Sequence, residues 1–297
     1  MLKVVPQYFF QNATDFPLLF HKYEACLLYK CLHQNQLQGE YFVSAHVFTV
    51  VLQGKKIIHT DDGKRMEVGA GTAVFLPRDL YMIQDIIAEK GAFESWLFFL
   101  TDQQVGRFLE TRDTDGLKKV QIQRDRPAEL PFYDYSEALR LYCEGLTPLM
   151  KAVKRPAQLV DIKLQELMHI VAAGAGGDVF IEQLRQLKPE RRNIKKLMEQ
   201  HYDHPLKVED YAYLSGRSVT SFHRDFKASF GTSPKQWLMD KRMEKASELL
   251  KSGERSVTTA AYDSGYENIS HFIKAFKKRF GISPGKFSQH HTGLQAG

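Results

Sequence analysis

The chain has little cysteine and no long hydrophobic run. Its 297 residues include only three cysteines, Cys26, Cys31 and Cys143. An odd and small number does not predict a disulfide framework, so we expect free, buried thiols in a reducing cytoplasm. No apolar run approaches the length of a membrane span, and the first residues (MLKVVPQYFFQ) have no signal-peptide pattern. The sequence therefore predicts a cytoplasmic protein without a membrane partner.

Motifs for catalysis and for cofactor binding are also missing. The sequence has no Gly-rich phosphate loop and no convincing nucleophile motif. His33, His46 and His59 each stand alone, and the residues between Cys26 and Cys31 (LLYK) read as a strand, so neither set predicts a metal site. We expect no catalytic residues, no metal and no cofactor, and hence no enzyme.

What the sequence does contain is a segment that occurs twice, fifty positions apart. Residues 218–237 read SVTSFHRDFKASFGTSPKQW, and residues 268–287 read NISHFIKAFKKRFGISPGKF. Seven of the twenty aligned positions are identical, among them three Phe, the Gly and the Ser-Pro pair. A duplicated structural unit is the simplest explanation.

Phenylalanine recurs every four residues in both copies, which predicts an amphipathic helix with one buried stripe. Gly231 and Gly281 are expected to end these helices in left-handed caps, and the Ser-Pro pairs to begin the next helices. The predicted stripes consist of Phe222, Phe226 and Phe230 in the first copy and Phe272, Phe276 and Phe280 in the second.

A shorter helix is expected upstream of each copy, at Val208–Leu214 and Val257–Asp263. Each leads into a glycine, Gly216 or Gly265, with an alanine four positions before it. The alanine lets two helices cross closely, and the glycine permits a tight turn between them. The pattern predicts two helix-turn-helix motifs, each with a basic outer face.

Residues from about 193 to 287 resemble the AraC/XylS class of transcription regulators. The stretch AAYDSGYENISHFIKAFKKRFGISP at 260–284 is similar to that family's signature. The resemblance implies seven helices, with a long linker helix at Pro234–Lys251 between the two motifs. It also implies that the second helix of each motif, the recognition helix, enters one of two successive major-groove segments of promoter DNA. RNA polymerase is a further partner that the resemblance implies.

The family's roles transfer to polar positions on the two predicted recognition helices. Arg224 is expected to make bidentate contacts to guanine, Lys274 to reach the same edge less rigidly, and Ile269 to offer apolar contact. The base-facing candidates are Thr220, His223 and Arg224, together with Ile269, Ser270, His271 and Lys274. The phosphate-binding candidates are Lys227, Lys277, Lys278 and Arg279, which contribute affinity but little sequence choice. The alternative for each is a solvated helix face.

The charge distribution favours the same function. Residues 190–297 contain 19 Lys and Arg against 12 Asp and Glu, a net charge of +7, while the whole chain carries +6. The basic excess is therefore confined to the duplicated region, as expected for a nucleic-acid-binding module.

The first part of the chain reads as short strands separated by Gly, Pro and Asp turns, which predicts a small antiparallel barrel or sandwich. Val47–Leu52 and Lys55–His59 are expected to pair as a hairpin, and the run VGAGTAVFLPR at 68–78 resembles a turn of cupin-like barrels. Seven aromatic side chains are expected to fill the core or to line a pocket: Tyr41, Phe42, Phe48, Phe75, Tyr81, Phe93 and Trp96.

Amphipathic helices are expected between the two regions, at Tyr135–Lys151, Ala157–Ala173 and Val179–Leu187. They would pack against the barrel, dimerise, or do both. Segments at 161–171, 180–187 and 194–202 resemble the subgroup of the family that contains activators of type III secretion genes. In that subgroup the N-terminal domain mediates self-association and answers to a protein antagonist.

The sequence thus predicts an α+β protein of three parts: a cupin-like antiparallel β-barrel regulatory domain at 1–130, a helical dimerisation or connector segment at 131–187, and an all-α DNA-binding domain with two helix-turn-helix motifs at 188–297. The expected function is a sequence-specific transcription activator that forms a homodimer and answers to a small-molecule or protein effector. Two alternatives stay open. One is a metal-dependent cupin enzyme fused to a DNA-binding module, and the other is a regulator switched by a protein partner with no small-molecule ligand.

Overall fold

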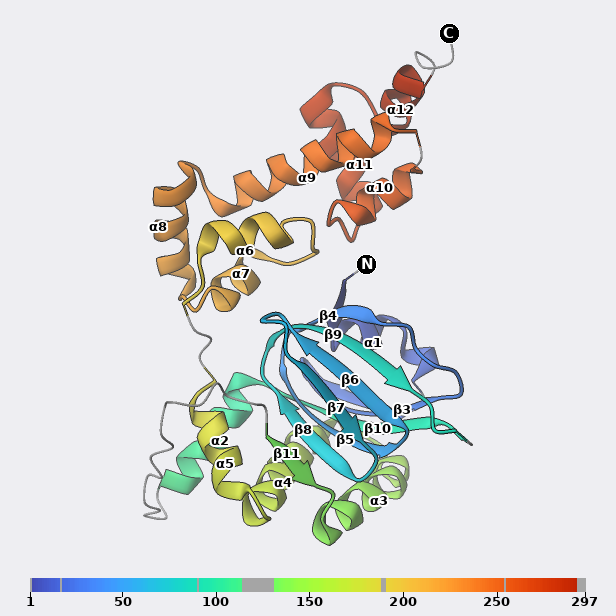
Figure 1. Cartoon of the computed structure of the whole chain (residues 1–297), viewed down its shortest axis with the longest axis vertical. Coiled ribbons are helices and arrows are strands. Elements are labelled where there is room, and N and C mark those ends of the chain that lie inside the picture. Colours follow the sequence, from blue (N-terminus) through green and yellow to red (C-terminus); the bar gives the residue numbers. More distant parts are fainter. Residues whose placement is uncertain are drawn as a thin grey trace. The chain divides into compact units, whose positions relative to one another are not determined.

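The chain divides into two compact units, Lys3–Leu187 and one that consists essentially of Lys188–Gly297 (Figure 1). The computed structural model describes residues 2–16, 18–89, 91–113, 131–187, 191–253 and 255–292. The helices expected at 131–187 belong to the same unit as the strands. The domain boundary expected near residue 130 lies outside the described residues.

The first unit contains two β-sheets. One has the strand order β1-β4-β9-β6-β7 and the other the order β11-β8-β5-β10-β3-β2. Neighbouring strands are antiparallel except β1 and β4, which are parallel. The strands are β1 (Lys3–Val5), β2 (Leu19–Lys22), β3 (Ala25–Leu32), β4 (Gly39–Val43), β5 (His46–Gln53), β6 (Lys55–Thr60), β7 (Arg65–Gly69), β8 (Thr72–Leu76), β9 (Asp79–Ile86), β10 (Phe93–Leu100) and β11 (Phe132–Asp134).

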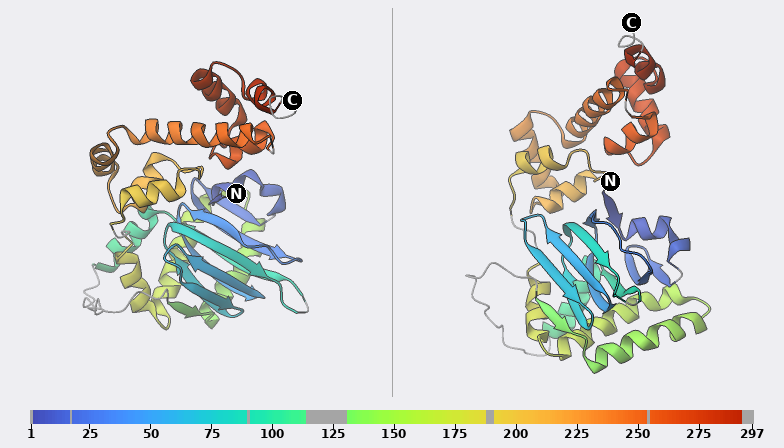
Figure 2. Two further views of the ribbon diagram at one scale, coloured as in Figure 1. Left: turned by 45° about the horizontal axis from the view of Figure 1, so that its top comes forward. Right: turned by 45° about the vertical axis from the view of Figure 1, so that its right-hand side comes forward.

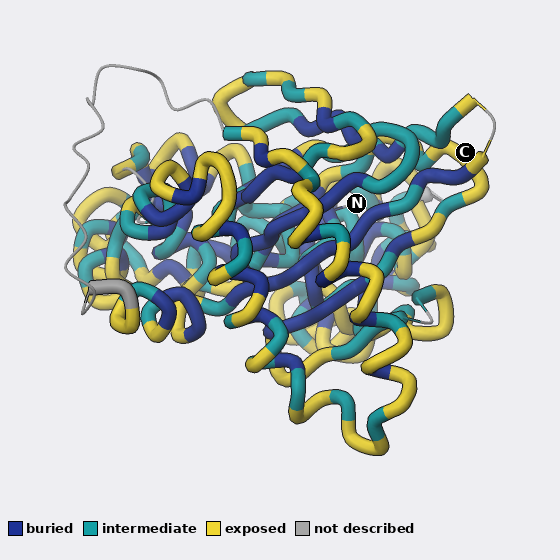
Figure 3. Tube along the Cα trace, turned by 90° about the horizontal axis from the view of Figure 1, so that it is seen from below, coloured by how far each residue is buried: buried dark blue, intermediate teal, exposed yellow. Residues whose placement is uncertain are grey.

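The two sheets share one hydrophobic core, and helices cover the other face of the second sheet. Val47 and Phe99 of the second sheet pack with Val43 and Ile58 of the first. On the opposite face, Phe48 and its neighbours pack against the helices. Figure 2 shows these helices beside the strands. Because both of its faces are covered, the second sheet contains long buried stretches. Figure 3 shows the buried stretches of the chain in dark blue. The helices of this unit are α1 (Gln7–Gln11), η1 (Ala13–Asp15), α2 (Asp102–Asp113), α3 (Glu137–Ala152), η2 (Pro156–Leu159), α4 (Val160–Ala173) and α5 (Gly177–Arg185).

The hairpin expected from Val47–Leu52 and Lys55–His59 is wrong, because β5 and β6 belong to different sheets. The chain passes from one sheet to the other at Gly54, which has a φ of +77°. A Cβ at this position would lie 2.4 Å from the carbonyl oxygen of Ile86, so only glycine fits without a shift. A hairpin does form between β6 and β7, with its turn at residues 61–64.

Free thiols are found as expected, but one of the three is not buried. Cys26 and Cys143 are buried, whereas Cys31 is exposed at the end of β3. All seven aromatic residues that were expected in the core or in a pocket are buried. Only Tyr41 among them lines the cavity of about 30 Å³ between the sheets, so the core interpretation is the better one.

Three charged side chains lie in the interior between the sheets. Asp85 on β9 is 1% exposed and accepts hydrogen bonds from Lys30 Nζ at 2.6 Å and Lys56 Nζ at 2.5 Å. Burial alone would raise the pKa of Asp85, but the two lysines lower it below its usual value. Burial lowers the pKa of Lys56 despite the neighbouring carboxylate. The cluster thus places two ammonium groups beside one carboxylate, and Lys30 Nζ also donates to Gln36 Oε1.

The second unit is built from helices. The seven helices that the family resemblance implies are present with the expected linker, α9. None of the described helices of the chain is long and apolar enough to cross a membrane. The helices of this unit are α6 (Ile194–His201), α7 (Val208–Leu214), α8 (Val219–Phe230), α9 (Pro234–Lys251), α10 (Val257–Asp263), α11 (Ile269–Phe280) and α12 (Pro284–Thr292).

Candidate DNA interface

The two recognition helices, α8 and α11, begin with equivalent caps. The Ser218 side chain accepts a hydrogen bond from the backbone N–H of Ser221 at 3.2 Å, and Asn268 Oδ1 accepts from the N–H of His271 at 2.9 Å. Each cap satisfies one of the backbone N–H groups that a helix leaves unpaired at its start. The first turn of each helix is thereby fixed.

The ends of these helices are equivalent too. Gly231 and Gly281 adopt the left-handed conformation, with φ of +73° and +77°, and their N–H groups bond to the carbonyls of Lys227 and Lys277. These are the predicted glycine caps. Ser233 then caps the next helix at Gln236, and proline follows it at the first helical position, also as predicted.

The apolar stripe of each recognition helix packs against an aromatic residue from the following helix. Phe226 lies 4.4 Å from Phe230 and 5.9 Å from Trp237, measured between ring centroids. In the second copy Phe276 lies 4.4 Å from Phe280 and 5.2 Å from Phe287. Two equivalent aromatic cores therefore hold the two recognition helices, which confirms the duplication read from the sequence.

The helix before each recognition helix meets it at a tight turn. Ala212 on α7 and Ala261 on α10 are buried. Gly216 and Gly265, four residues later, have φ of +68° and +85°. A Cβ on Gly265 would lie 2.7 Å from the carbonyl oxygen of Asp203, in the loop between α6 and α7. The turn of the second motif is thus in close contact with the loop that precedes the first motif.

The linker helix α9 fixes the first motif to the second. Arg242 donates to the carbonyls of Tyr202, His204 and Leu206 at 2.8, 2.5 and 3.1 Å. Lys245, one turn later, pairs with Asp203. These contacts hold the loop between α6 and α7 against α9, whose other end packs on α10 and α12. The structure thus couples the two motifs within one unit.

The predicted DNA-binding residues lie on the outer faces of the recognition helices. All are exposed except Ile269, which is partly exposed. None of them belongs to the buried stripe. The exposed base-facing candidates are Thr220, His223, Arg224, Ser270, His271 and Lys274, and the exposed phosphate-binding candidates are Lys227, Lys277, Lys278 and Arg279.

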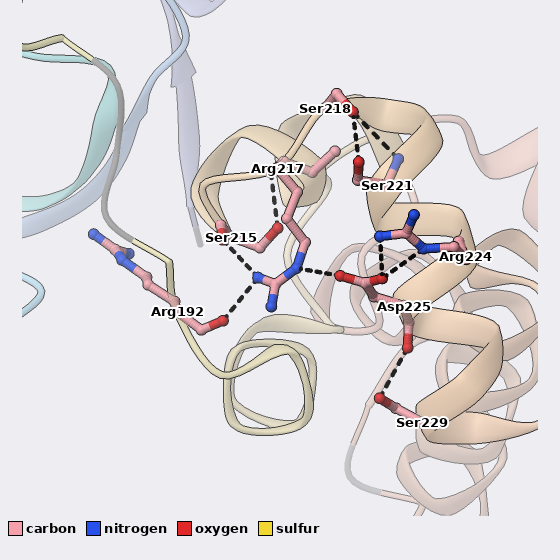
Figure 4. Close-up of polar contacts among 9 residues, drawn as sticks. Arg192, Ser215, Arg217, Ser218, Ser221, Arg224, Asp225 and Ser229 are labelled. Atoms are coloured by element: carbon pink, nitrogen blue, oxygen red, sulfur yellow. Dashed lines mark hydrogen bonds and ion pairs between the residues drawn. The ribbon is translucent and has the colours of Figure 1, made fainter.

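Arg224 is paired with its neighbour Asp225 (Figure 4). Arg224 Nε donates to Asp225 Oδ1 at 3.0 Å, and Arg217 Nε donates to Asp225 Oδ2 at 3.1 Å. Arg217 in turn donates to the backbone carbonyls of Arg192 and Ser215 at 2.9 and 2.7 Å. Hydrogen bonds from Arg217 and then Arg224 hold the pKa of Asp225 below its usual value.

Sequence reasoning missed both Arg217 and Asp225. Arg217 stands in the turn before α8, where helical periodicity makes no prediction. Asp225 is the only acidic residue on α8, and the copies differ at both positions, since Glu267 and Ala275 stand fifty residues later. A position-by-position comparison of the two copies would have drawn attention to both residues, because the copies differ in charge at these positions.

The described residues provide no group of three His, Cys, Asp or Glu side chains that could hold a metal ion. Of the three isolated histidines, His46 is buried and already bonded. Its Nδ1 accepts the N–H of Arg78 at 3.0 Å, so its Nε2 carries the hydrogen and donates to Asp102 at 2.8 Å. This bond from His46 lowers the pKa of Asp102.

Two family models match the chain, one in each unit. Residues 46–182 match the ExsA N-terminal regulatory domain, and residues 211–290 match a helix-turn-helix domain of the AraC type. The first match agrees with the resemblance to the subgroup that contains type III secretion activators.

The chain is also similar to whole regulators. It is 35% identical over 282 residues to an uncharacterised HTH-type transcriptional regulator of Haemophilus influenzae, which covers 85% of this chain and 91% of that protein. It is 27% identical over 240 residues to the thermoregulatory protein LcrF of Yersinia pestis, with 79% of this chain and 86% of that protein covered.

Among solved structures, the chain is similar to an apo ToxT variant of Vibrio cholerae, at 10% identity and a TM-score of 0.42 over 88% of this chain and 96% of that one. The duplicated motifs with their exposed basic faces agree with the family matches. The chain belongs to the AraC family of DNA-binding transcription regulators.

Proposed function

We propose that α8 and α11 enter successive major-groove segments of promoter DNA and read its sequence. The observation that carries this proposal is the repetition of one arrangement: the same caps, the same buried stripe, and polar or basic residues at equivalent exposed positions. Arg224 and Lys274 occupy corresponding places in the two copies and have the side chains suited to guanine. The linker α9 keeps the two helices at a fixed spacing.

Phosphate contacts supply most of the affinity in this proposal. Lys277, Lys278 and Arg279 lie in the last turn of α11, and Lys227 has the corresponding place in the last turn of α8. Each lysine or arginine that neutralises a phosphate releases counterions, which makes binding weaker as salt increases. Base contacts by the residues nearer the helix starts then select the sequence.

The first unit receives the signal and mediates self-association in our proposal. Leu141 and Leu149 on α3 and Ile162 on α4 are exposed apolar residues on helices outside the sheets, which suits a contact between two copies. Relatives of the chain include proteins named as transcriptional activators, such as VirF of Yersinia enterocolitica. We therefore propose a cytoplasmic, homodimeric activator that contacts RNA polymerase and answers to a small-molecule or protein effector.

Two alternatives make different predictions. A metal-dependent enzyme joined to a DNA-binding module would bind metal in stoichiometric amounts, and we expect the purified protein to contain none. A regulator switched by a protein alone would show no stabilisation by any metabolite in a thermal-shift screen and would retain a partner in a pull-down.

The test of the proposed function is selection of binding sites from random duplex DNA by the full-length protein, followed by affinity titration across salt concentrations. We expect a motif that spans two major-groove segments, repeated if two protomers bind. Salt-sensitive binding without any motif would contradict sequence reading by α8 and α11.

A further inference from the structure

Asp225 connects a rigid anchor to an exposed arginine. Arg217 is 12% exposed and is fixed by two backbone carbonyls, Asp225 is 26% exposed, and Arg224 is 73% exposed. The order of contacts runs from the backbone through Arg217 and Asp225 to the guanidinium of Arg224 (Figure 4). An exposed arginine on a helix normally samples many rotamers, and this one is held in place by a partner that is itself held.

The contact leaves the far edge of the Arg224 guanidinium free. Nε and Nη2 of Arg224 both lie 3.0 Å from Asp225 Oδ1. A guanidinium has five N–H donors, one on Nε and two on each Nη. Asp225 therefore occupies the Nε side, while Nη1 and the second N–H of Nη2 remain for a ligand. That pair of donors is the fork that binds the O6 and N7 acceptors of guanine.

The second motif has no counterpart of this arrangement. Lys274 corresponds to Arg224, Ala275 to Asp225, and Glu267 to Arg217. Within the described part of the chain, Lys274 makes no ion pair with another side chain. A lysine is a flexible point charge, so it discriminates among bases less than a fixed planar fork does. The two motifs are therefore unequal in the rigidity of their basic side chain.

We infer that Asp225 is a positioning residue that sets the sequence specificity of the first motif by fixing Arg224 for guanine. This inference rests on the proposed base-reading role of Arg224. It assigns most of the discrimination of one protomer to α8 and a more tolerant contact to α11. The carboxylate also repels phosphates, so it weakens binding to unrelated sequences while it improves the choice of the correct one.

The experiment measures discrimination, defined as the ratio of Kd values for a duplex changed at the guanine and for the preferred duplex. The full-length protein is compared with Asp225→Asn, Arg224→Ala and the double variant. Asp225→Asn should lower discrimination by about two- to tenfold, the range expected when one freed side chain must be immobilised on binding. It should also raise affinity for unrelated DNA. In the Arg224→Ala background, Asp225→Asn should leave discrimination unchanged.

Ser229→Ala is the matched control on the same helix. The Ser229 hydroxyl donates to the backbone carbonyl of Asp225 at 2.9 Å, and within the described residues it makes no bond to the Asp225 carboxylate. We expect it to leave discrimination unchanged. If Asp225 had only a structural role, Asp225→Asn would weaken binding to both duplexes by the same factor, and the ratio of the two Kd values would not change. If Asp225→Asn does not fold, Asp225→Glu keeps the charge near Arg217 but displaces the carboxylate, and the same comparison applies.

Three results would overturn the inference. If Arg224→Ala lowers discrimination but Asp225→Asn does not, Asp225 does not position Arg224, and the proposed function stands. If Asp225→Asn lowers discrimination equally in both backgrounds, Asp225 acts independently of Arg224. If Arg224→Ala itself leaves discrimination unchanged, the base-reading role of Arg224 fails, and the inference fails with it.

Discussion

At the scale of single residues, the least usual feature is a carboxylate shared by two buried lysines. Asp85 is the only carboxylate that pairs with Lys30 and Lys56 among the described residues. An ion that loses its partner inside a protein carries a desolvation cost of several kcal/mol. The first unit therefore depends on Asp85 far more than on any carboxylate at its surface.

Asp85→Asn should lower the free energy of unfolding of the full-length protein by about 3–5 kcal/mol, because it leaves two buried ammonium groups without a counter-charge. Urea denaturation of the variant and the wild type measures this. Glu67→Gln is the control, since Glu67 pairs with Lys55 and Arg65 at the surface, where water screens the ion pair and its removal should change stability little. Equal losses in the two variants would show that the interior cluster is neutralised in another way.

The cluster of Lys30, Lys56 and Asp85 also predicts that stability depends on pH. The pKa of Asp85 is lowered in the folded protein. Its contribution to stability is therefore present above the unfolded pKa of about 3.9 and is lost as the pH falls through the folded value. Urea midpoints between pH 7 and pH 3 should fall for the wild type, and the fall should be smaller for Asp85→Asn. Parallel curves would contradict this assignment.

Lys277 is a separate prediction, because it is proposed to bind phosphate and not a base. Lys277→Ala should weaken binding to all duplexes alike and reduce the slope of log K against log salt by about 1. Affinity titration on the selected motif and on unrelated DNA, at several salt concentrations, measures both effects. A loss confined to the selected motif would place Lys277 at a base.

Periodicity predicts which residues lie on the helix faces, but it does not predict the contacts that residues in the turns make. Helical periodicity separates Phe222 and Phe226 from the exposed positions between them, so the outer face of α8 follows from spacing alone. The contact between Arg217 and Asp225 joins a turn to a helix. It depends on how the turn folds back, which no periodicity encodes.

At the scale of elements, the turn of each helix-turn-helix depends on its glycine. Gly265→Ala combines an unfavourable backbone conformation with a Cβ that would meet the carbonyl of Asp203 and the side chain of Arg242. The left-handed conformation alone costs about 1–2 kcal/mol for a residue with a Cβ. We expect a loss of stability above about 2 kcal/mol in thermal or urea unfolding, because the close contact adds to that backbone cost.

Gly281→Ala separates these two causes. Gly281 has a similar φ of +77°, but a Cβ there would meet no atom within 4 Å. Gly281→Ala should therefore lose only the backbone cost of about 1–2 kcal/mol. If both variants lose the same stability, the close contact at Gly265 does not restrict the turn.

The strands were predicted better than their pairing. The segments at 47–52 and 55–59 form β5 and β6 nearly as expected. The predicted pairing of β5 with β6 is wrong because β5 is buried on both faces. Its sequence therefore shows no alternation of apolar and polar residues and does not indicate which strand lies beside it. The parallel pair β1–β4 joins residues about forty positions apart, and local pattern carries no information at that separation.

At the scale of the whole molecule, the division into two units separates charge as well as structure. The basic excess lies in residues 190–297, while the exposed apolar residues Leu141 and Ile162 lie on helices of the other unit. DNA affinity and self-association therefore belong to different units in our proposal. Joining two protomers raises affinity for a repeated site through effective concentration without any new DNA contact.

A fragment of residues 188–297 should accordingly fold alone and select the same motif as the full chain. On duplexes with two copies of the motif, the full chain should bind about 100-fold more tightly than on one copy, whereas the fragment should gain only the statistical factor of two sites. Titrations of both proteins on one-copy and two-copy duplexes measure this. A fragment that binds two copies cooperatively would place the dimer contact in the second unit, and a fragment with a changed motif would show that the first unit takes part in reading DNA.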